Sequence, residues 1–293
     1  MNCYKKPRHY HCLKMRGPFL TAAAAAGLAT AMTVPTSGVS NAELTNGVMS
    51  PSSLGAQAAG PLHFENWSGA TRAGTGFNKI VGTVNVPDWR NRADGWDTGM
   101  YMAVRLDGFP GCGKDSPLAS IGHVTSPRGS NGDMRANGFR ASWSWGGYIG
   151  GSENILSFPL RVGDEVHMEL IVLTPTKVNG TIKNLNTGQE VYRIMNNPDG
   201  FCGTTANWVV GTYSGLGRPR PLTEFFGNVT FTGASATTGA GETLNLAGAQ
   251  AMVIDQTWMT DPTTGPVQGG LQTDCNIVGD SSVTCKRLFP TPP

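Results

Sequence analysis

Hydrophobic and polar residues alternate in short stretches along most of the chain, which is the pattern of β-strands with one buried face. Gly, Pro, Asn, Asp and Ser separate these stretches and favour turns between them. Strands are predicted over residues 65–72, 78–86, 100–106, 138–145, 166–173, 178–184, 190–195, 207–213, 225–232 and 251–257. Short strands at such intervals predict an all-β sandwich or barrel, and a chain of 293 residues can form it as one domain.

Two turn regions refine this prediction. Residues 184–189, NLNTGQ, join two alternating stretches, and their Asn and Gly residues favour left-handed backbone conformations, so we expect a β-hairpin there. The Gly-rich segment 233–242, GASATTGAGE, is predicted to be a surface loop between strands.

The first 42 residues differ from the rest. Five basic residues precede an apolar run of small residues over 19–32, and Ser40 and Ala42 place small side chains before a cleavage point. This layout predicts a signal peptide over residues 1–42, with a retained membrane anchor as the alternative. We therefore expect a secreted protein, extracellular or periplasmic.

The segment after this leader has no apolar period and many small residues. It predicts a flexible lead-in over residues 43–61, followed by the folded domain over residues 62–293. The leader holds five of the 22 Lys and Arg and none of the 20 Asp and Glu, so the rest has a formal charge of −3. A mildly acidic chain gives no electrostatic reason to expect nucleic acid or anionic lipid as a partner.

Six cysteines are present, and two of them, Cys3 and Cys12, lie in the leader. An even set remains in a chain bound for an oxidising compartment, which predicts two disulfides. The four cysteines are Cys112, Cys202, Cys275 and Cys285. None forms a C-x-x-C pair and the three remaining histidines are far apart, so we expect no metal site and no cofactor. Serine-hydrolase, zinc-peptidase, calcium and phosphate-loop motifs are also absent from the sequence.

Short motifs occur in a fixed order over residues 64–286. They are FENWSGA from Phe64, GTGF from Gly74, TVNVP from Thr83, LDG from Leu106, GD from Gly163, NLNTGQ from Asn184, CGTTA from Cys202, AQ from Ala249, TDC from Thr273 and VTC from Val283. In this order they resemble the glutamic peptidase (eqolisin) family.

The resemblance implies a concanavalin A-like, jelly-roll sandwich of two curved antiparallel sheets, with a substrate groove on a concave face. It also implies the disulfides Cys112–Cys202 and Cys275–Cys285. Glutamic peptidases are hydrolases that use a Glu as general base, and a Gln that positions the attacking water and stabilises the oxyanion.

Both catalytic positions hold other residues here. The family segment C-x-T-N-A-E-F-I-I-E matches residues 202–211, which puts Gly211 at the catalytic Glu and Asn207 at the earlier Glu. The family segment A-I-L-Q-T-G matches residues 118–124, which puts Gly122 at the Gln, or His123 after a slip that turns the side chain to the other face. Neither Gly nor Asn can serve as the base near neutral pH, so the resemblance implies a degenerate site.

Two further groove positions differ from the family. Its Tyr-Glu-Trp reads Trp143-Ser144-Trp145, and its Trp-Val-Gly-Ile-Asp-Gly reads AVRLDG, which retains an acid as Asp107. An Asp before Gly is typical of a turn, with a catalytic acid as the alternative. Aromatic residues at period two are typical of a sandwich core, with ligand stacking as the alternative. The candidate ligand contacts are Trp67, Trp143, Ser144, Trp145, Asn207 and Trp208.

We hypothesise a secreted, monomeric pseudoenzyme of glutamic-peptidase type, with a groove for an extended peptide, a protein segment or a glycan. The alternative is an active acid endopeptidase with altered catalytic residues, for which the candidate groups are His123, Asp107, Glu224 and Glu153. A third hypothesis is a purely structural scaffold, since fold does not imply function.

Overall fold

A computed structural model describes residues 3–6, 9–12, 60–90, 98–108, 116–125, 140–145, 153–155, 158–212, 224–256, 260–261, 265–266 and 270–288. The chain divides into two compact units, Met1–Val48 and Met49–Pro293. In the first unit, β1 (Cys3–Lys6) and β2 (His9–Cys12) form an antiparallel hairpin. The predicted signal-peptide and domain boundaries stay predictions, and most of the lead-in lies outside the described residues. None of the described segments is a helix long and apolar enough to cross a bilayer.

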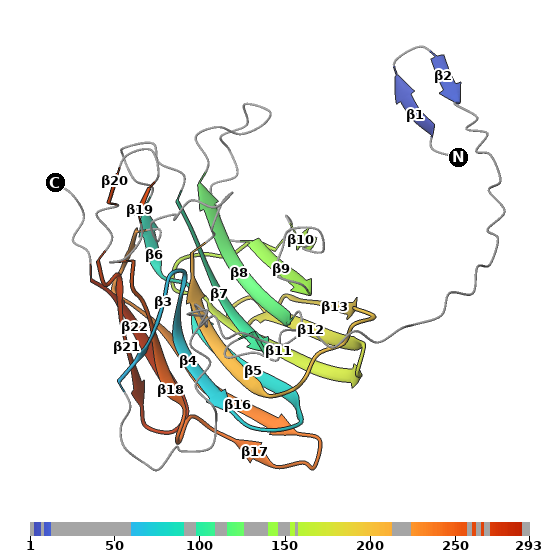
Figure 1. Cartoon of the computed structure of the whole chain (residues 1–293). Coiled ribbons are helices and arrows are strands. Elements are labelled where there is room, and N and C mark those ends of the chain that lie inside the picture. The colour runs from blue at the N-terminus through green and yellow to red at the C-terminus, as the bar shows by residue number, and fades with distance from the viewer. Residues whose placement is uncertain are drawn as a thin grey trace, which may run out of the picture. The chain divides into compact units, whose positions relative to one another are not determined.

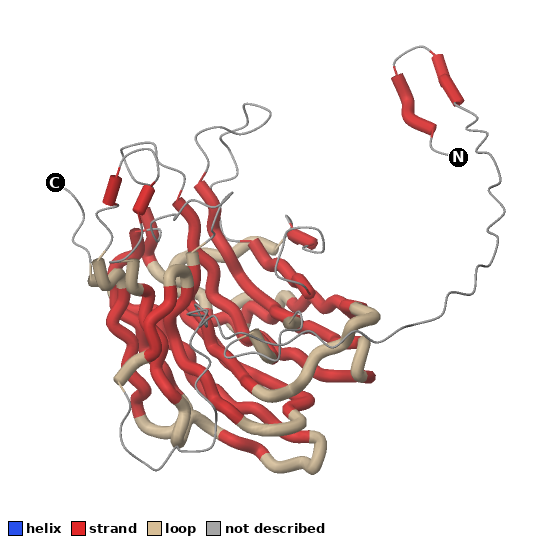
Figure 2. The backbone as a smooth tube through the Cα atoms, in the orientation of Figure 1, coloured by secondary structure: helices blue, strands red, loops and turns tan. Residues whose placement is uncertain are grey.

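The second unit consists of two large sheets packed face to face (Figures 1 and 2). The first sheet contains, in spatial order, β10 (Glu153–Ile155), β9 (Arg140–Trp145), β8 (Pro117–Thr125), β7 (Thr98–Leu106), β14 (Thr205–Gly211), β4 (Trp67–Ala73), β18 (Gln250–Ile254) and β3 (Leu62–Phe64). The second contains β13 (Glu190–Asn196), β12 (Lys177–Asn184), β11 (Glu165–Thr174), β5 (Phe77–Asn85), β16 (Asn228–Thr238), β22 (Ser282–Arg287) and β21 (Thr273–Val278), with β17 (Thr243–Leu244) paired to β16.

Two short antiparallel pairs complete the described strands. They are β6 (Asp88–Arg90) with β15 (Glu224–Phe226), and β19 (Thr260–Asp261) with β20 (Gly265–Pro266). Described pairings within the large sheets are antiparallel except that of β3 with β18, which is parallel. The predicted all-β sandwich is therefore confirmed.

Two tryptophans of the first sheet fill the core between the sheets. Trp143 and Trp208 are almost fully buried, and each indole lies against a glycine of the second sheet. A Cβ at Gly180 would lie 2.5 Å from Trp143 Cδ1, and one at Gly82 would lie 2.8 Å from Trp208 Cδ1. Trp208 Nε1 also donates a hydrogen bond to the carbonyl oxygen of Val81 at 2.7 Å. Both indoles therefore lie in the core, which favours the core interpretation of these tryptophans over ligand stacking.

The Gly-rich segment 233–242 was wrongly predicted to be a loop. Its first half continues β16 as far as Thr238, after a register shift between Thr232 and Ser235 in the pairing with β5. Ala234 and Ala236 are buried in the core. A β-bulge inserts an extra residue and so breaks the alternation from which a strand is predicted.

The hairpin predicted over residues 184–189 is present between β12 and β13. The side-chain oxygen of Asn184 accepts hydrogen bonds from the amides of Asn186 at 2.9 Å and Thr187 at 3.1 Å. Gly188 takes a left-handed conformation with φ of 75°. Asn and Gly therefore do at this turn what their backbone preferences predict.

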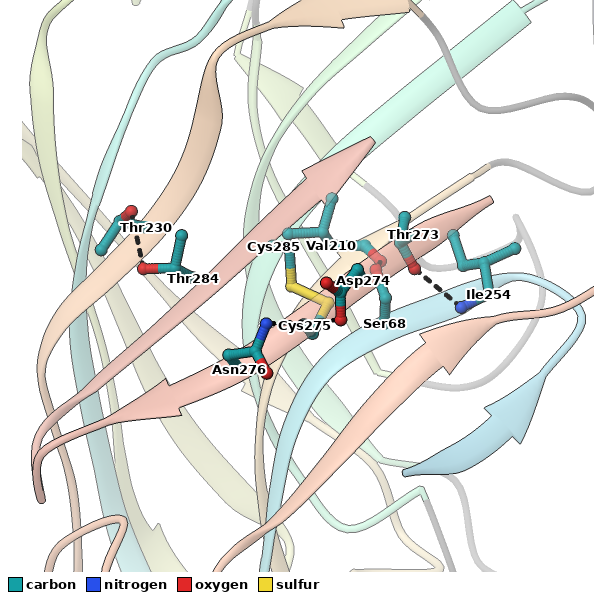
Figure 3. The surroundings of a disulfide bond; sticks show 10 residues. All are labelled: Ser68, Val210, Thr230, Ile254, Thr273, Asp274, Cys275, Asn276, Thr284 and Cys285. Atoms are coloured by element: carbon teal, nitrogen blue, oxygen red, sulfur yellow. Dashed lines mark hydrogen bonds between the residues drawn. A yellow bond between two sulfur atoms is a disulfide. The ribbon is translucent and has the colours of Figure 1, made fainter. Parts of the chain in front are cut away.

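A disulfide between Cys275 and Cys285 joins β21 and β22 at directly paired positions (Figure 3). Both cysteines are buried in the core. Nearby, Thr273 Oγ1 accepts a hydrogen bond from the Ile254 amide at 2.8 Å, which connects the two sheets. The Cys275–Cys285 disulfide was implied by the family resemblance and is confirmed. Cys202 is also disulfide-bonded, and Cys112 lies outside the described residues.

We expect the double variant Cys275→Ala/Cys285→Ala to lose about 3 kcal/mol of unfolding free energy, because the bond removes loop-closure entropy from the unfolded chain. Urea unfolding without reductant measures the loss. A matched control is Asn276→Ala/Thr284→Ala, the neighbouring register pair, whose side chains lie outside the core. Equal losses in the two variants would contradict the prediction.

A polar network covers the exposed face of the second sheet around His167. Lys79 and Glu169 form an ion pair at 2.6 Å, and Thr83 Oγ1 lies 3.2 Å from His167 Nδ1. Burial lowers the pKa of His167 below its ordinary value of 6.5, with the nearby lysines acting in the same direction.

Below pH 6.5 the unfolded chain therefore binds a proton at His167 more readily than the folded chain. Stability from this group is complete above pH 6.5 and is lost as the pH falls toward the lowered folded pKa. We expect His167→Gln to lose less stability than the wild type over this window. Urea unfolding of the wild type and the variant, at one pH above this window and one below it, measures the two losses of unfolding free energy. Equal losses in the two proteins would contradict the assignment.

Candidate functional site

The first sheet has a second face, opposite the core, which we call the outer face. Its residues form rows that cross the strands, because directly paired residues point to the same side of a sheet. The central row contains Met252, Gly69, Val209, Ala103, Ser120 and Ser142. The row on one side contains Trp67, Gly211, Tyr101 and Gly122. The row on the other side contains Gln250, Thr71, Asn207, Arg105, Leu118 and Ser144.

The central row is small and buried. Ala103, Val209 and Met252 are at most 2% exposed, yet they do not belong to the cluster that forms the core between the sheets. The adjacent rows contribute larger side chains, and Trp67, Tyr101 and Arg105 are only half-buried. The outer face therefore carries a buried strip of small residues between two rows of larger side chains, and Arg105 of one row contacts Trp67 of the other across the strip.

The two positions matched to the family's catalytic pair lie on this face. Gly211 and Gly122 both pair directly with Tyr101, one from each side, so they point the same way and are two strand spacings apart. A Cβ built on Gly211 would lie 2.4 Å from Tyr101 Cζ and 2.6 Å from its Oη. The Tyr101 ring thus occupies the space in which a side chain at position 211 would begin.

This contact predicts coupling between positions 211 and 101. Gly211→Ala is expected to cost about 1 kcal/mol because the ring must move, and to cost almost nothing when Tyr101→Ala is already present. A double-mutant cycle of urea unfolding measures the coupling. If the losses of the two single variants add up in the double variant, the Tyr101 ring does not resist a side chain at position 211.

Asp107 is fully buried and has a left-handed φ of 62°. Its Oδ2 accepts hydrogen bonds from the amides of Cys202 at 2.6 Å and Gly203 at 2.8 Å. Its Oδ1 accepts from the Thr204 amide at 2.7 Å, from the Thr204 hydroxyl at 3.0 Å and from the Thr205 amide at 3.3 Å. Both carboxylate oxygens thus bind the segment that leads into β14, which is a structural role different from bonding the local backbone of a turn.

Three other candidate ligand contacts, Asn207, Trp67 and Ser144, lie on the outer face of the first sheet. Asn207 is 2% exposed, and its Nδ2 donates to the carbonyl oxygen of Asp107 at 2.8 Å. The guanidinium of Arg105 lies 4.4 Å from the centre of the Trp67 ring, a cation–π contact on the outer face. Ser144 is half-buried on the same row as Asn207.

Trp145 lies on the opposite side of β9, together with Trp143. Its ring meets Phe201 edge-on, with centroids 6.1 Å apart, and it packs against the core. It therefore does not share the outer face with Gly211.

The remaining acid–base candidates are not brought together by strand pairing. Glu224 pairs with Arg90 in the small sheet formed by β6 and β15, and Glu153 pairs with Trp143 at the edge of the first sheet. His123 pairs with Met100, one residue out of step with Gly122. The side chains of these three candidates lie outside the described part of the structure.

Sequence reasoning missed two residues of the outer face. Tyr101 became visible only through its pairing with both glycines, which are distant in sequence. Ser120 lies 2% exposed in the central row, with its hydroxyl 2.7 Å from that of Ser142. Among the described residues, no group of three or more His, Cys, Asp or Glu side chains is arranged to hold a metal ion.

Comparisons with known proteins place this geometry in a family. The Peptidase A4 family model matches residues 65–287. Aspergillopepsin-2 of Aspergillus niger is 25% identical over 235 residues, covering 74% of this chain and 75% of its own. Scytalidopepsin B of Scytalidium lignicola is 25% identical over 233 residues, covering 76% of this chain and 78% of its own.

Solved structures give the same fold. Scytalido-glutamic peptidase with a transition state analogue inhibitor superposes with a TM-score of 0.61 at 22% identity, over 76% of this chain and 98% of that one. A second structure, of the eqolisin peptidase SCP-B with the tripeptide Ala-Ile-His, gives a TM-score of 0.57 at 24% identity, with the same coverage. The chain therefore belongs to the Peptidase A4 family, the glutamic peptidases or eqolisins.

Proposed function

We propose that this chain is a secreted glutamic-peptidase-like protein without endopeptidase activity, which binds an extended peptide in a groove on the outer face of the first sheet. The observation that carries the proposal is the pair of glycines, Gly211 and Gly122, on either side of Tyr101, whose ring lies against Gly211. A general base must accept a proton from the attacking water, and glycine has no group that can do so.

Among the described residues of the outer face, none carries a carboxylate that could replace the missing base. The acid retained from the family motif, Asp107, already accepts hydrogen bonds on both oxygens. If the Gly of the family's A-I-L-Q-T-G is placed on Gly122, the Gln falls on Ser120, which lies on the same outer face. Ser120 and Gly122 both lack a side-chain amide, so either match removes the Gln group that would stabilise an oxyanion.

The peptide ligand is inferred from the relatives and from the shape of the outer face. Related structures contain a peptide-based transition state analogue or a tripeptide. In this chain, the face that carries the two matched positions also presents the half-buried side chains of Trp67, Tyr101 and Arg105. Secretion is inferred from the leader-like first 42 residues.

The test is incubation of purified protein with reduced, carboxymethylated casein from acidic to neutral pH, scored for cleavage and for binding by fluorescence anisotropy. We expect binding without cleavage. Acid cleavage abolished by Glu224→Gln would overturn the proposal in favour of an active endopeptidase. Absence of both cleavage and binding would favour a glycan ligand or a structural scaffold.

A pair of matched variants locates the groove. Ala103→Leu adds bulk to the buried central row, whereas Ala73→Leu adds the same bulk at an exposed position of the same sheet. Casein binding is expected to fall at least tenfold in the first and to be retained in the second. Thermal melting checks that both variants fold, and equal binding by both would place the ligand elsewhere.

A further inference from the structure

Three Asn-x-Ser/Thr sequences occur in the chain, and the proposed function involves none of their asparagines. They are NWS from Asn66, NGT from Asn179 and NVT from Asn228. Such a sequence is the acceptor for N-linked glycosylation in secreted proteins when its middle residue is not proline. All three lie among the described residues, so the structure distinguishes between the three asparagines.

Two of these asparagines have a side-chain oxygen that is enclosed by protein. Asn66 and Asn179 are half-buried, and the Oδ1 of each is fully buried. Asn66 directly precedes β4, where Ser68 of the same acceptor sequence is completely buried. Asn179 lies within β12 and pairs directly with Ile171 on one side and Ile194 on the other. A sugar joined to either carboxamide would press against protein and lose contact with water, which its hydroxyl groups require.

Asn228 differs from the other two in exposure and in bonding. It is exposed at the first position of β16, directly after Gly227, whose left-handed φ of 77° forms the preceding turn. Its main-chain carbonyl accepts a hydrogen bond from Asn85 Nδ2 at 3.3 Å, whereas its side-chain amide forms none within the part of the chain that the structure describes. The next residue, Val229, points into the core, so the Asn228 side chain points away from it.

The surface around Asn228 is polar. Its directly paired residue on β22 is Lys286, which is exposed. Thr230, the third residue of the acceptor sequence, lies on the same face of β16, with its Oγ1 3.1 Å from Thr284 Oγ1 on β22. Ammonium and hydroxyl groups form hydrogen bonds with sugar hydroxyls, so this face suits the first sugar of a glycan.

We infer that Asn228 is an N-glycosylation site, and that of the three asparagines it alone carries a glycan in the folded protein. The donor class is an oligosaccharide joined through pyrophosphate to a membrane lipid. The bond from Asn228 Nδ2 to C1 of the first sugar forms, the C1–O bond to pyrophosphate breaks, the lipid pyrophosphate leaves with that electron pair, and the amide gives up one proton. A secretory pathway supplies this donor, so the inference rests on the secretion part of the proposed function and on no other part of it.

The glycan and the proposed peptide site lie on opposite sides of the sandwich. The Asn228 side chain is on the face of the second sheet that points away from the first sheet, and the peptide is proposed to bind the outer face of the first sheet (Figure 1). Casein binding is therefore expected to be the same before and after enzymatic removal of the glycan.

The experiment expresses the full chain in a yeast host that performs N-glycosylation and, for comparison, in a bacterial host that does not. Intact mass is measured before and after digestion with peptide N-glycosidase. We expect the yeast protein in the medium to carry the mass of one glycan, which digestion removes, and the bacterial protein to carry none. The digestion converts a glycosylated Asn to Asp, and peptide mapping is expected to locate this conversion at position 228.

Variants of the acceptor sequences complete the test. Asn228→Gln and Thr230→Ala are each expected to remove the added mass, whereas Thr230→Ser keeps it because serine also completes the acceptor. Asn66→Gln and Asn179→Gln are the matched controls and are expected to leave it unchanged. Secreted protein without a glycan, or with one at position 66 or 179, would overturn the inference alone. A chain that stays inside the yeast cell, unmodified and with its leader uncleaved, would overturn the inference together with the proposed secretion.

Discussion

Replacing Asp107 by Ala is expected to cost about 4 kcal/mol or more of unfolding free energy, enough to leave much of the chain unfolded. The carboxylate accepts hydrogen bonds from four backbone amides of residues 202–205 and from the Thr204 hydroxyl. Alanine leaves these donors buried without an acceptor, and each such donor costs about 1–3 kcal/mol.

A series at position 107 separates this structural role from a catalytic one. Asp107→Asn keeps one acceptor oxygen and puts an NH2 group against donors, so its stability should lie between those of the wild type and Asp107→Ala. Asp274→Ala, at an exposed aspartate of β21, is the control and should change stability by less than about 0.5 kcal/mol. A catalytic acid without a structural role predicts instead that Asp107→Ala unfolds at the same urea concentration as the wild type.

Gly69→Ala is the second substitution expected to be severe, with a loss of about 3 kcal/mol or more. Gly69 has φ of 128°, a conformation that residues with a Cβ rarely adopt, and its Cβ would lie 1.9 Å from the carbonyl oxygen of Trp208. The neighbouring strand cannot retreat easily, because Trp208 is anchored through its indole to Val81 in the other sheet.

Gly76→Ala provides the matched comparison. Gly76 also has a positive φ, of 67°, but a Cβ there would meet nothing within 4 Å. Its cost is therefore limited to that of one left-handed residue, about 1 kcal/mol. Thermal melting and urea unfolding should show a much lower stability for Gly69→Ala than for Gly76→Ala. Similar stability of the two variants would show that β14 can move away from β4.

The fold was predictable from the sequence because alternation and turn residues are local signals. The hairpin at Asn184 carries its own hydrogen-bonding side chain, and the strands of the second sheet alternate cleanly between buried and exposed positions. The bulge after Thr232 was missed because an extra residue in a strand breaks the alternation that identifies it.

The site was only partly predictable, since it depends on which strands become neighbours. The motif match located Gly211 and Gly122 separately, whereas the strand order brings them to either side of Tyr101. Likewise, an Asp-Gly pair indicates a turn, but nothing local reveals that Asp107 holds a segment about a hundred residues further along the chain. Long-range pairing cannot be derived from residue preferences alone.

The contact between Tyr101 and Gly211 also bears on the history of the family. A glutamate at position 211 and a tyrosine at position 101 compete for the same space, so a lineage cannot exchange one without disturbing the other. With the ring in its present position, a substitution of Gly211 by Glu meets a steric barrier. Across related sequences, a large aromatic residue at the counterpart of 101 should therefore accompany a small residue at the counterpart of 211, and the two should change together.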